Sequence, residues 1–598
     1  MGAILYESLS GEPAFSGKTS LEVAHAVLYE EPRPLDGASV PASVDRVVRR
    51  ALAKSRDARY PSAEAMAHEL RSVPDVAGAA PDRIPDGRQQ ESTPRSWQEA
   101  FEQLSQADQS GERLGPEDLE ALGEAAMWTG RHRESISARQ RAYAAHVQAD
   151  QPRRAAMVAL DLVIDHLSRH SESVAAGWLG RARRLLDGAP EGPEHGHLLA
   201  TEAYMLLGRG DVEGALERAR AVFDLGRRFA DVDLRALGLT FEGYALVRQG
   251  RVPEGISLLD EAMASASAGE LGPLVTRIVY CQTLCACLDL FDYRRALEWT
   301  EAAGRCSAIT DTKGFPGDCR AHHAAILVAR GQWARGEEEA RTVCAESGPF
   351  TLGHIAQATY QIGEIRRRSG DLTGAEQAFG RVHALGTAPE PGLSLLRLAQ
   401  GHVEDARSSI AGALADVPEG DRLRRARLLP AQVEIALAAG DTESARSAAA
   451  ELAGIAADYR SAALRAAAEC AAGALALSEG DAAEAGRRLR DGCRLWLEAE
   501  APYEAARARV ALAEAWGAEG NAAARALELK AAKSLFERLG AVRDVQRAEQ
   551  ALSQQQDVTG RRICLVCDSA QGLPAAVRIQ TPHGPENVPH GRRRALGA

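Results

Sequence analysis

The chain has 598 residues, of which 45% are hydrophobic and only 5% aromatic, and its formal net charge is −12. This length predicts several domains or one long repeat array, and the shortage of aromatic residues favours helices packed through small side chains over a large sheet. The mild negative charge argues against a general nucleic-acid binder. The sequence shows neither the pattern of a secretory signal peptide nor an apolar run of the roughly 18 residues that span a membrane. We therefore expect a cytoplasmic protein.

Residues 1–72 form the first predicted domain, a compact block with three helical patterns. Within it, Gly17-Lys18-Thr19 follows Gly11 and suggests a phosphate-binding loop. A phosphate-binding loop has four residues between its two glycines, and the loop itself connects a buried strand to a helix. Here five residues intervene, and Pro13 and Phe15 are bulky where the backbone should wrap tightly. We therefore interpret this stretch as something other than a nucleotide site.

Three stretches of this block carry a family resemblance: "GAILYESLSGEPAFSG", "SLEVAHAVLYEEPRPL" and "VPASVDRVVRRALAKSRDARYPSAEAMAHEL". They resemble the central helix, the next helix and the final helices of the C-lobe of bacterial serine/threonine protein kinases, which makes Gly17-Lys18-Thr19 a surface loop and places Arg59 at the family's buried arginine. The family's glycine-rich loop, strand lysine and two aspartates precede the central helix, where this chain begins. We expect a catalytically incomplete C-lobe remnant, with ATP and Mg²⁺ as cofactors only if the missing segments exist.

Residues 73–95 read as a linker, because they hold four prolines and two glycines without an apolar period. From residue 96 to 556 a pattern of Gly, a polar residue, three further residues and a small residue recurs about every 40 residues. The repeats start at Gly130, Gly210, Gly250, Gly331, Gly370, Gly440 and Gly480, more loosely at Gly520, and in degenerate form at Phe291 and Gly401. A fixed period is typical of a solenoid, so we predict an all-α array of about eleven helical hairpins.

Each repeat carries its own helix signals. Gly can end a helix in the left-handed conformation, and the Asp after it can cap the next helix, with Asp481 and Glu484 matching a full capping box. Ala215 and Ala219 fall on one helix face, where they allow close packing. The array resembles tetratricopeptide repeats, and "APYEAARARVALAEA" is similar to the repeat region of large bacterial LuxR-type regulators.

No catalytic, cofactor-binding or metal-binding residue is predicted. Cys281, Cys285 and Cys287 lie on one expected helix and are interpreted as buried thiols, because no second ligand cluster is evident. Adjacent His322 and His323 point to different faces and are interpreted as structural. Cys564 and Cys567 form a CxxC motif without the second pair of a zinc ribbon.

Residues 557–598 are expected to be an irregular, disordered tail that lacks the helix-turn-helix of LuxR-type regulators. The predicted function is a protein–protein interaction scaffold in bacterial signalling, with a protein partner on the concave face of the repeats. We expect that face to use Leu198 to Leu207, Thr240 to Val247 and Thr359 to Arg367. Two alternatives stay open: part of an active kinase whose catalytic segments are missing, and a regulator that has lost its DNA-binding end.

Overall fold

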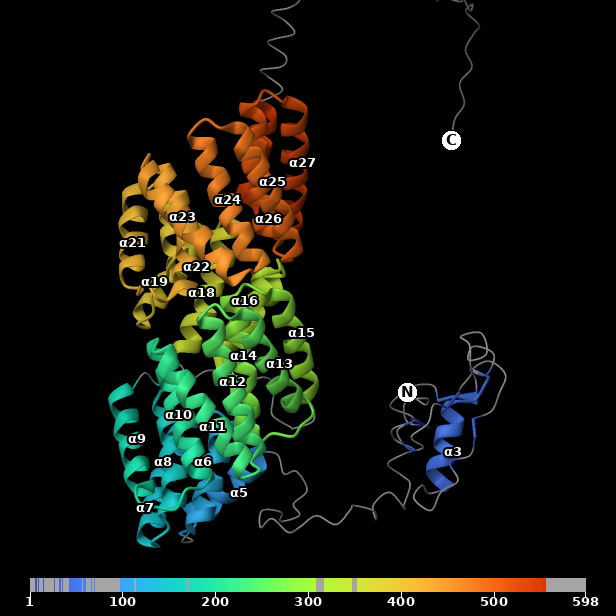
Figure 1. Cartoon of the computed structure of the whole chain (residues 1–598), viewed down its shortest axis with the longest axis vertical. Coiled ribbons are helices and arrows are strands. Elements are labelled where there is room, and N and C mark those ends of the chain that lie inside the picture. The colour runs from blue at the N-terminus through green and yellow to red at the C-terminus, as the bar shows by residue number, and fades with distance from the viewer. Residues whose placement is uncertain are drawn as a thin grey trace, which may run out of the picture. The chain divides into compact units, whose positions relative to one another are not determined.

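The computed structural model (Figure 1) describes scattered positions between residues 6 and 69, and then residues 97–554 with four gaps. The gaps fall at residues 112–113, 168 and 170, 308–316, and 347–351, and side chains are also left out at 303–307, 317–319 and 346. The chain divides into two compact units, Met1–Thr93 and Pro94–Ala598, which are described one at a time. All regular elements among the described residues are helices.

The first unit contains helix α3 (Ala42–Ala51), whose Val44 and Val48 pack with Tyr6 and Leu35 in a small core. Arg59 is exposed and donates to the backbone carbonyl of Ala53 at 2.6 Å. The arginine expected at the place of the family's buried one is therefore exposed in this structure. Gly17-Lys18-Thr19 falls outside the described residues.

The second unit begins with α5 (Trp97–Gln109) and continues as eleven antiparallel hairpins over its described residues. The first six are α6 (Pro116–Trp128) with α7 (His132–Gln148), α8 (Pro152–Leu167) with α9 (Glu172–Leu186), α10 (Pro193–Arg209) with α11 (Val212–Arg228), α12 (Val232–Arg248) with α13 (Val252–Ser267), α14 (Pro273–Asp289) with α15 (Tyr293–Ser307), and α16 (Gly317–Ala329) with α17 (Trp333–Glu346).

The other five are α18 (Leu352–Ser369) with α19 (Leu372–Ala384), α20 (Gly392–Ala399) with α21 (Val403–Ala415), α22 (Arg422–Ala438) with α23 (Thr442–Tyr459), α24 (Ala462–Ser478) with α25 (Ala482–Glu498), and α26 (Pro502–Ala518) with α27 (Ala522–Leu539). A further helical stretch covers residues 542–554. The predicted all-α solenoid of about eleven hairpins is confirmed, and the short interval after Gly370 corresponds to α20, which has only 8 residues. No described helix combines the length and the apolar character needed to cross a membrane.

The hairpin turns follow the predicted chemistry. Gly480 has φ +87°, and the Asp481 carboxylate accepts the backbone N–H of Glu484 at 3.0 Å, capping α25. The reciprocal half of the capping box is not formed, because the Asp481 backbone N–H donates to the Ala476 carbonyl at 2.9 Å instead. At the degenerate repeat, Phe291 takes the glycine's place with φ +56°, a conformation that costs a non-glycine residue about 1–2 kcal/mol.

The helices form two layers along the chain. From α8 to α26, the first helix of each hairpin contacts the first helix of the next, and we call these helices the inner layer. Each second helix packs between its own first helix and the following one. Small residues permit this close packing: Ala215 and Ala219 of α11 are fully buried, as their shared face predicted.

A further set of contacts, here called the seam, joins helices that are far apart in sequence. The seam joins the C-terminal end of an earlier first helix to the N-terminal end of a later helix. The pairs are α12 with α22, α14 with α24, α16 with α26, and α20 with the stretch 542–554. Ser461 donates to the carbonyl of Leu290 at 2.5 Å across 171 residues, and Arg248 pairs with Asp421 at 3.1 Å. Arg543 donates to the Ala399 carbonyl at 2.5 Å. Later hairpins therefore pack directly onto earlier ones, beyond the nearest-neighbour contacts that a solenoid requires.

The seam also contains hydrophobic cores. Val247 and Leu290 share one cluster with Leu423 and Tyr459, so residues of α12 and α14 are buried against those of α22 and α23. Farther along, the Trp333 ring lies edge-on to Tyr503 with ring centroids 5.6 Å apart, within a cluster that includes residues of α16, α18, α26 and α27. Burial of apolar surface is the main stabilising term in such contacts.

Candidate functional site

The three segments expected to bind a partner lie on inner-layer helices α10, α12 and α18, but most of their side chains are buried against neighbouring helices. In the first, Tyr204 is 37% exposed, while Leu198, Met205 and Leu207 are buried. From α10 to α24, each inner helix is flanked on both sides by other first helices. Few side chains of the three segments are therefore exposed.

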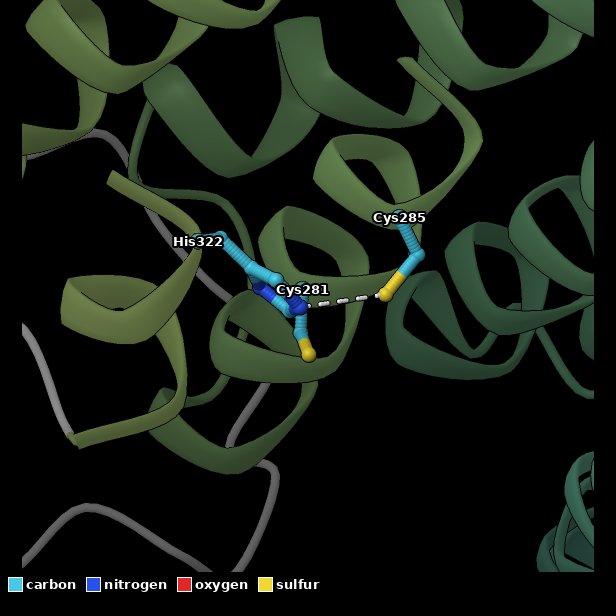
Figure 2. A group of neighbouring side chains, drawn as sticks. All are labelled: Cys281, Cys285 and His322. Atoms are coloured by element: carbon cyan, nitrogen blue, oxygen red, sulfur yellow. Dashed lines mark hydrogen bonds between the residues drawn. The ribbon is translucent and has the colours of Figure 1, made fainter. Parts of the chain in front are cut away.

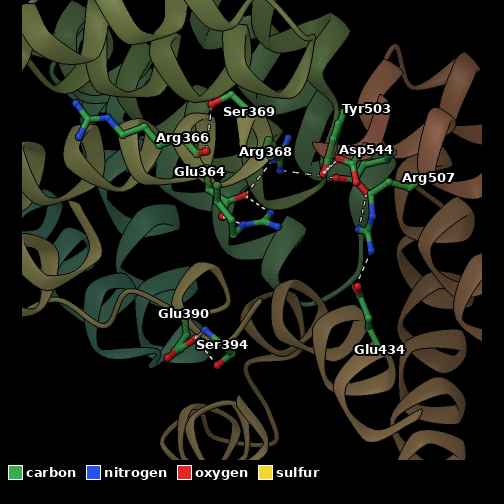
Figure 3. Close-up of polar contacts among 12 residues, drawn as sticks. Glu364, Arg366, Arg368, Ser369, Glu390, Ser394, Glu434, Tyr503, Arg507 and Asp544 are labelled. Atoms are coloured by element: carbon green, nitrogen blue, oxygen red, sulfur yellow. Dashed lines mark hydrogen bonds and ion pairs between the residues drawn. The ribbon is translucent and has the colours of Figure 1, made fainter. Parts of the chain in front are cut away.

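A group of charged side chains lies where α18 faces α26 (Figure 3). We call it the charged cluster. Glu364 of α18 is only 6% exposed and accepts two hydrogen bonds from Arg367 at 2.9 Å and one from Arg368 at 3.1 Å. Burial alone would raise the pKa of Glu364, but the two guanidinium groups outweigh it and lower the pKa to about 2. Glu364 is therefore a carboxylate at neutral pH.

The charged cluster continues across the seam onto α26 and α22. Arg507 of α26 pairs with Glu434 of α22 at 2.6 Å, and that carboxylate holds the pKa of Arg507 well above its ordinary value. Arg368 lies 3.7 Å from Glu504, and the Tyr503 hydroxyl donates to Asp544 at 3.0 Å. Arg507 and Glu434 keep about 40% of their side chains exposed, at 39% and 41%. Both signs of charge are thus partly exposed to solvent.

A second polar group joins three inner helices earlier in the array. Asp289 of α14 accepts from the Tyr244 hydroxyl of α12 at 2.8 Å and from Arg427 of α22 at 2.8 Å. Burial and the Asp289 carboxylate raise the pKa of Tyr244 well above 10, so its hydroxyl is a donor throughout the physiological range. The Arg427 side chain is 43% exposed, which leaves part of its guanidinium open to solvent.

Next to this group, the structure places His322 of α16 against the two cysteines of α14 (Figure 2). Cys285 Sγ lies 3.4 Å from His322 Nε2, and the ligand atoms of Cys281, Cys285 and His322 all lie within 4.8 Å of one another. The neighbouring Cys281 thiol and burial raise the pKa of Cys285 well above its ordinary value, so it is not an activated nucleophile. Cys287 points into a separate hydrophobic core, as expected of a buried thiol.

Sequence reasoning missed the role of His322 in this group. The spacing of Cys281 and Cys285 signalled a shared helix face, but His322 comes from the next first helix, 37 residues after Cys285. His323 points elsewhere, 3.7 Å from Glu339, as the different-face argument predicted. Cys564 and Cys567 of the tail lie outside the described residues.

These helices and their packing define an all-α solenoid of tetratricopeptide-like hairpins. No family model matches the chain. A stretch of 84 residues in the N-terminal part is 42% identical to serine/threonine-protein kinase PknB of Mycolicibacterium smegmatis, covering 14% of this chain and 13% of the kinase. A stretch of 77 residues is 43% identical to the kinase PkaA of Streptomyces coelicolor, covering 13% of this chain and 14% of that one. The chain thus spans only a small part of the curated relatives it matches.

Among solved structures, the array is similar at low score to two helical-repeat proteins. The Cut9–Hcn1 hetero-tetramer of the APC/C gives a TM-score of 0.33 at 12% identity, covering 76% of this chain and 93% of that one. The apo form of the quorum sensor NprR from B. thuringiensis gives 0.33 at 11% identity, covering 63% and 97%.

Proposed function

We propose that the repeat array is a protein–protein interaction scaffold that holds a segment of a partner protein along its inner layer. The observation that carries the proposal is a set of half-exposed charged side chains on two inner helices, Arg427 and Glu434 of α22 and Arg507 of α26. A helical or extended segment bound there would meet alternating charges, which select partners by electrostatic complementarity. The proposed site is therefore best matched by a segment that itself carries both acidic and basic residues.

The full chain, used as bait in a bacterial lysate and then cross-linked to what it retains, tests the proposal. We expect cross-links to the partner to fall on α18, α22 and α26. Arg427→Gln and Arg507→Gln should each weaken the recovered complex about tenfold, equivalent to about 1.4 kcal/mol. Arg494→Gln is the matched control, because Arg494 lies on the second helix α25 with 59% of its side chain exposed. Equal loss with the control, or cross-links confined to second helices, would contradict inner-layer binding.

The short kinase similarity suggests the origin of the N-terminal unit. We propose that residues 1–72 derive from a serine/threonine kinase C-lobe and that this chain by itself transfers no phosphate, since the family's catalytic residues are absent from its sequence. The alternative is that the repeats serve as the partner-binding extension of an active kinase. Nucleotide sequence upstream of Met1 distinguishes the two, because an in-frame stretch encoding the missing lobes would support the active kinase.

A direct binding measurement checks the absence of a nucleotide site. Calorimetry with Mg·ATP should detect no binding to the chain. Micromolar binding that disappears in Lys18→Ala would show that the Gly17-Lys18-Thr19 loop was wrongly dismissed.

A further inference from the structure

The group formed by Cys281, Cys285 and His322 has the donor set and spacing of a metal site. In tetrahedral zinc coordination, Zn–S bonds of about 2.3 Å and Zn–N bonds of about 2.0 Å place sulfur and nitrogen roughly 3.5 Å apart. The separation of Cys285 Sγ and His322 Nε2 is 3.4 Å, close to that value, and Cys281 Sγ completes a triangle of atoms within 4.8 Å. We propose that these three residues bind a zinc ion, with the fourth position open.

Burial of the histidine supports the assignment independently of these distances. His322 is 7% exposed, and its Nδ1 has no hydrogen-bond partner among the described residues. Buried imidazoles normally satisfy both nitrogens. In the described part of the chain, the hydrogen-bond partner of Nε2 is the weakly accepting or donating sulfur of Cys285. A metal ion between the ring and the two thiols would bind Nε2, which faces the Cys285 sulfur, and would replace this weak contact with a coordination bond, while Nδ1 would stay without a protein partner.

The site is built from rigid elements. Cys281 and Cys285 are four residues apart on α14 and share one helix face, while His322 is presented by α16, which packs on α14. Asp289 continues the same stripe of α14 one turn later, but it is held by Tyr244 and Arg427 and does not complete the ligand set. The fourth position therefore falls to water or to a group from a bound partner, and the ion would tie two successive inner helices together.

The test uses the full chain, freed of metal with a chelator under reducing conditions and titrated with Zn²⁺ or with Co²⁺ as the spectroscopic probe. We expect one equivalent to bind at this site, with thiolate-to-cobalt absorption, and Zn²⁺ to raise the melting temperature. Cys285→Ser and His322→Gln should each weaken binding about 100-fold or more, since even outer-shell changes cost 10–100-fold. Cys287→Ala, on the same helix but outside the site, is the matched control and should bind like the unmodified chain.

Two further variants keep the result decisive. Cys281 is only half-buried, so Cys281→Ser should keep the helical circular-dichroism spectrum and still lose metal binding. This variant therefore separates loss of a ligand from loss of folding. The double variant Cys564→Ser/Cys567→Ser removes the tail's CxxC motif and should leave the site's affinity intact. Absence of thiolate-to-cobalt absorption overturns the proposal, as does binding that depends on the tail cysteines and persists in Cys285→Ser.

Discussion

The hydroxyl of Tyr459 donates a 2.7 Å hydrogen bond to the backbone carbonyl of Arg248, 211 residues earlier in the chain. The Tyr459 ring is buried between α12 and the hairpin α22–α23, with only 2% of the residue exposed. The two residues belong to hairpins that no nearest-neighbour stacking would bring together. This bond is the most direct sign that the repeat array folds back onto itself through the seam.

Removing that hydroxyl should weaken the seam without disturbing any single hairpin. We expect Tyr459→Phe to lower the free energy of unfolding by about 1–2 kcal/mol, because the Arg248 carbonyl loses its partner in a buried place. Urea unfolding followed by circular dichroism measures the change. Tyr143→Phe, in α7 outside the seam, is the control and should have a smaller effect. Equal effects of the two variants would show that the seam contributes little to stability.

Glu364 should make stability depend on pH in the acidic range. Its folded pKa of about 2 lies below its ordinary value of 4.5, so its contribution is fully present above pH 4.5 and is lost as the pH falls toward 2. We expect Glu364→Gln to lower the free energy of unfolding by about 3 kcal/mol at neutral pH. The difference in unfolding free energy between the variant and the unmodified chain should shrink by more than half near pH 3. Urea titrations at several pH values measure it. Glu498→Gln, with 60% of its side chain exposed, should show no such narrowing.

Two glycines should respond to alanine in opposite directions. Gly480 has φ +87°, and no atom lies within 4 Å of an added Cβ, so Gly480→Ala should cost about 1 kcal/mol through backbone strain alone. Gly454 lies inside α23 with equal space around it, and Gly454→Ala should stabilise the protein by about 0.5–1 kcal/mol. Thermal unfolding of both variants checks the signs. Two changes of the same sign would contradict the turn geometry.

Cys470 and Cys493 should be inert while the protein is folded. Burial raises the pKa of both thiols from 9.0 to about 12. Folding therefore favours the neutral thiols. Their contribution to the free energy of unfolding is fully present below pH 9 and is lost as the pH rises toward 12. We expect iodoacetamide at about pH 8.5 to alkylate both much more slowly in buffer than in urea, as mass spectrometry of the peptides would show. Rapid alkylation in buffer would contradict their burial.

The sequence by itself determined the local architecture. The interval of about 40 residues, the glycines and the aspartates after them predicted where helices end and begin, because capping depends on groups three or four residues apart. Asp481 bonding to Glu484 N–H and the paired burial of Ala215 and Ala219 followed from such short spacings. The second half of the capping box did not follow, because the Asp481 backbone N–H is taken by the Ala476 carbonyl at the end of the preceding helix.

Only the tertiary structure decided which distant residues meet. The seam depends on small rotations between successive hairpins that accumulate along the array, so no local pattern shows that Tyr459 reaches Arg248 or that Arg507 reaches Glu434. His322 likewise joins Cys285 only through the packing of α16 on α14. Hairpin boundaries are set by short-range hydrogen bonds, whereas the polar groups that form the candidate sites are brought together by packing between helices.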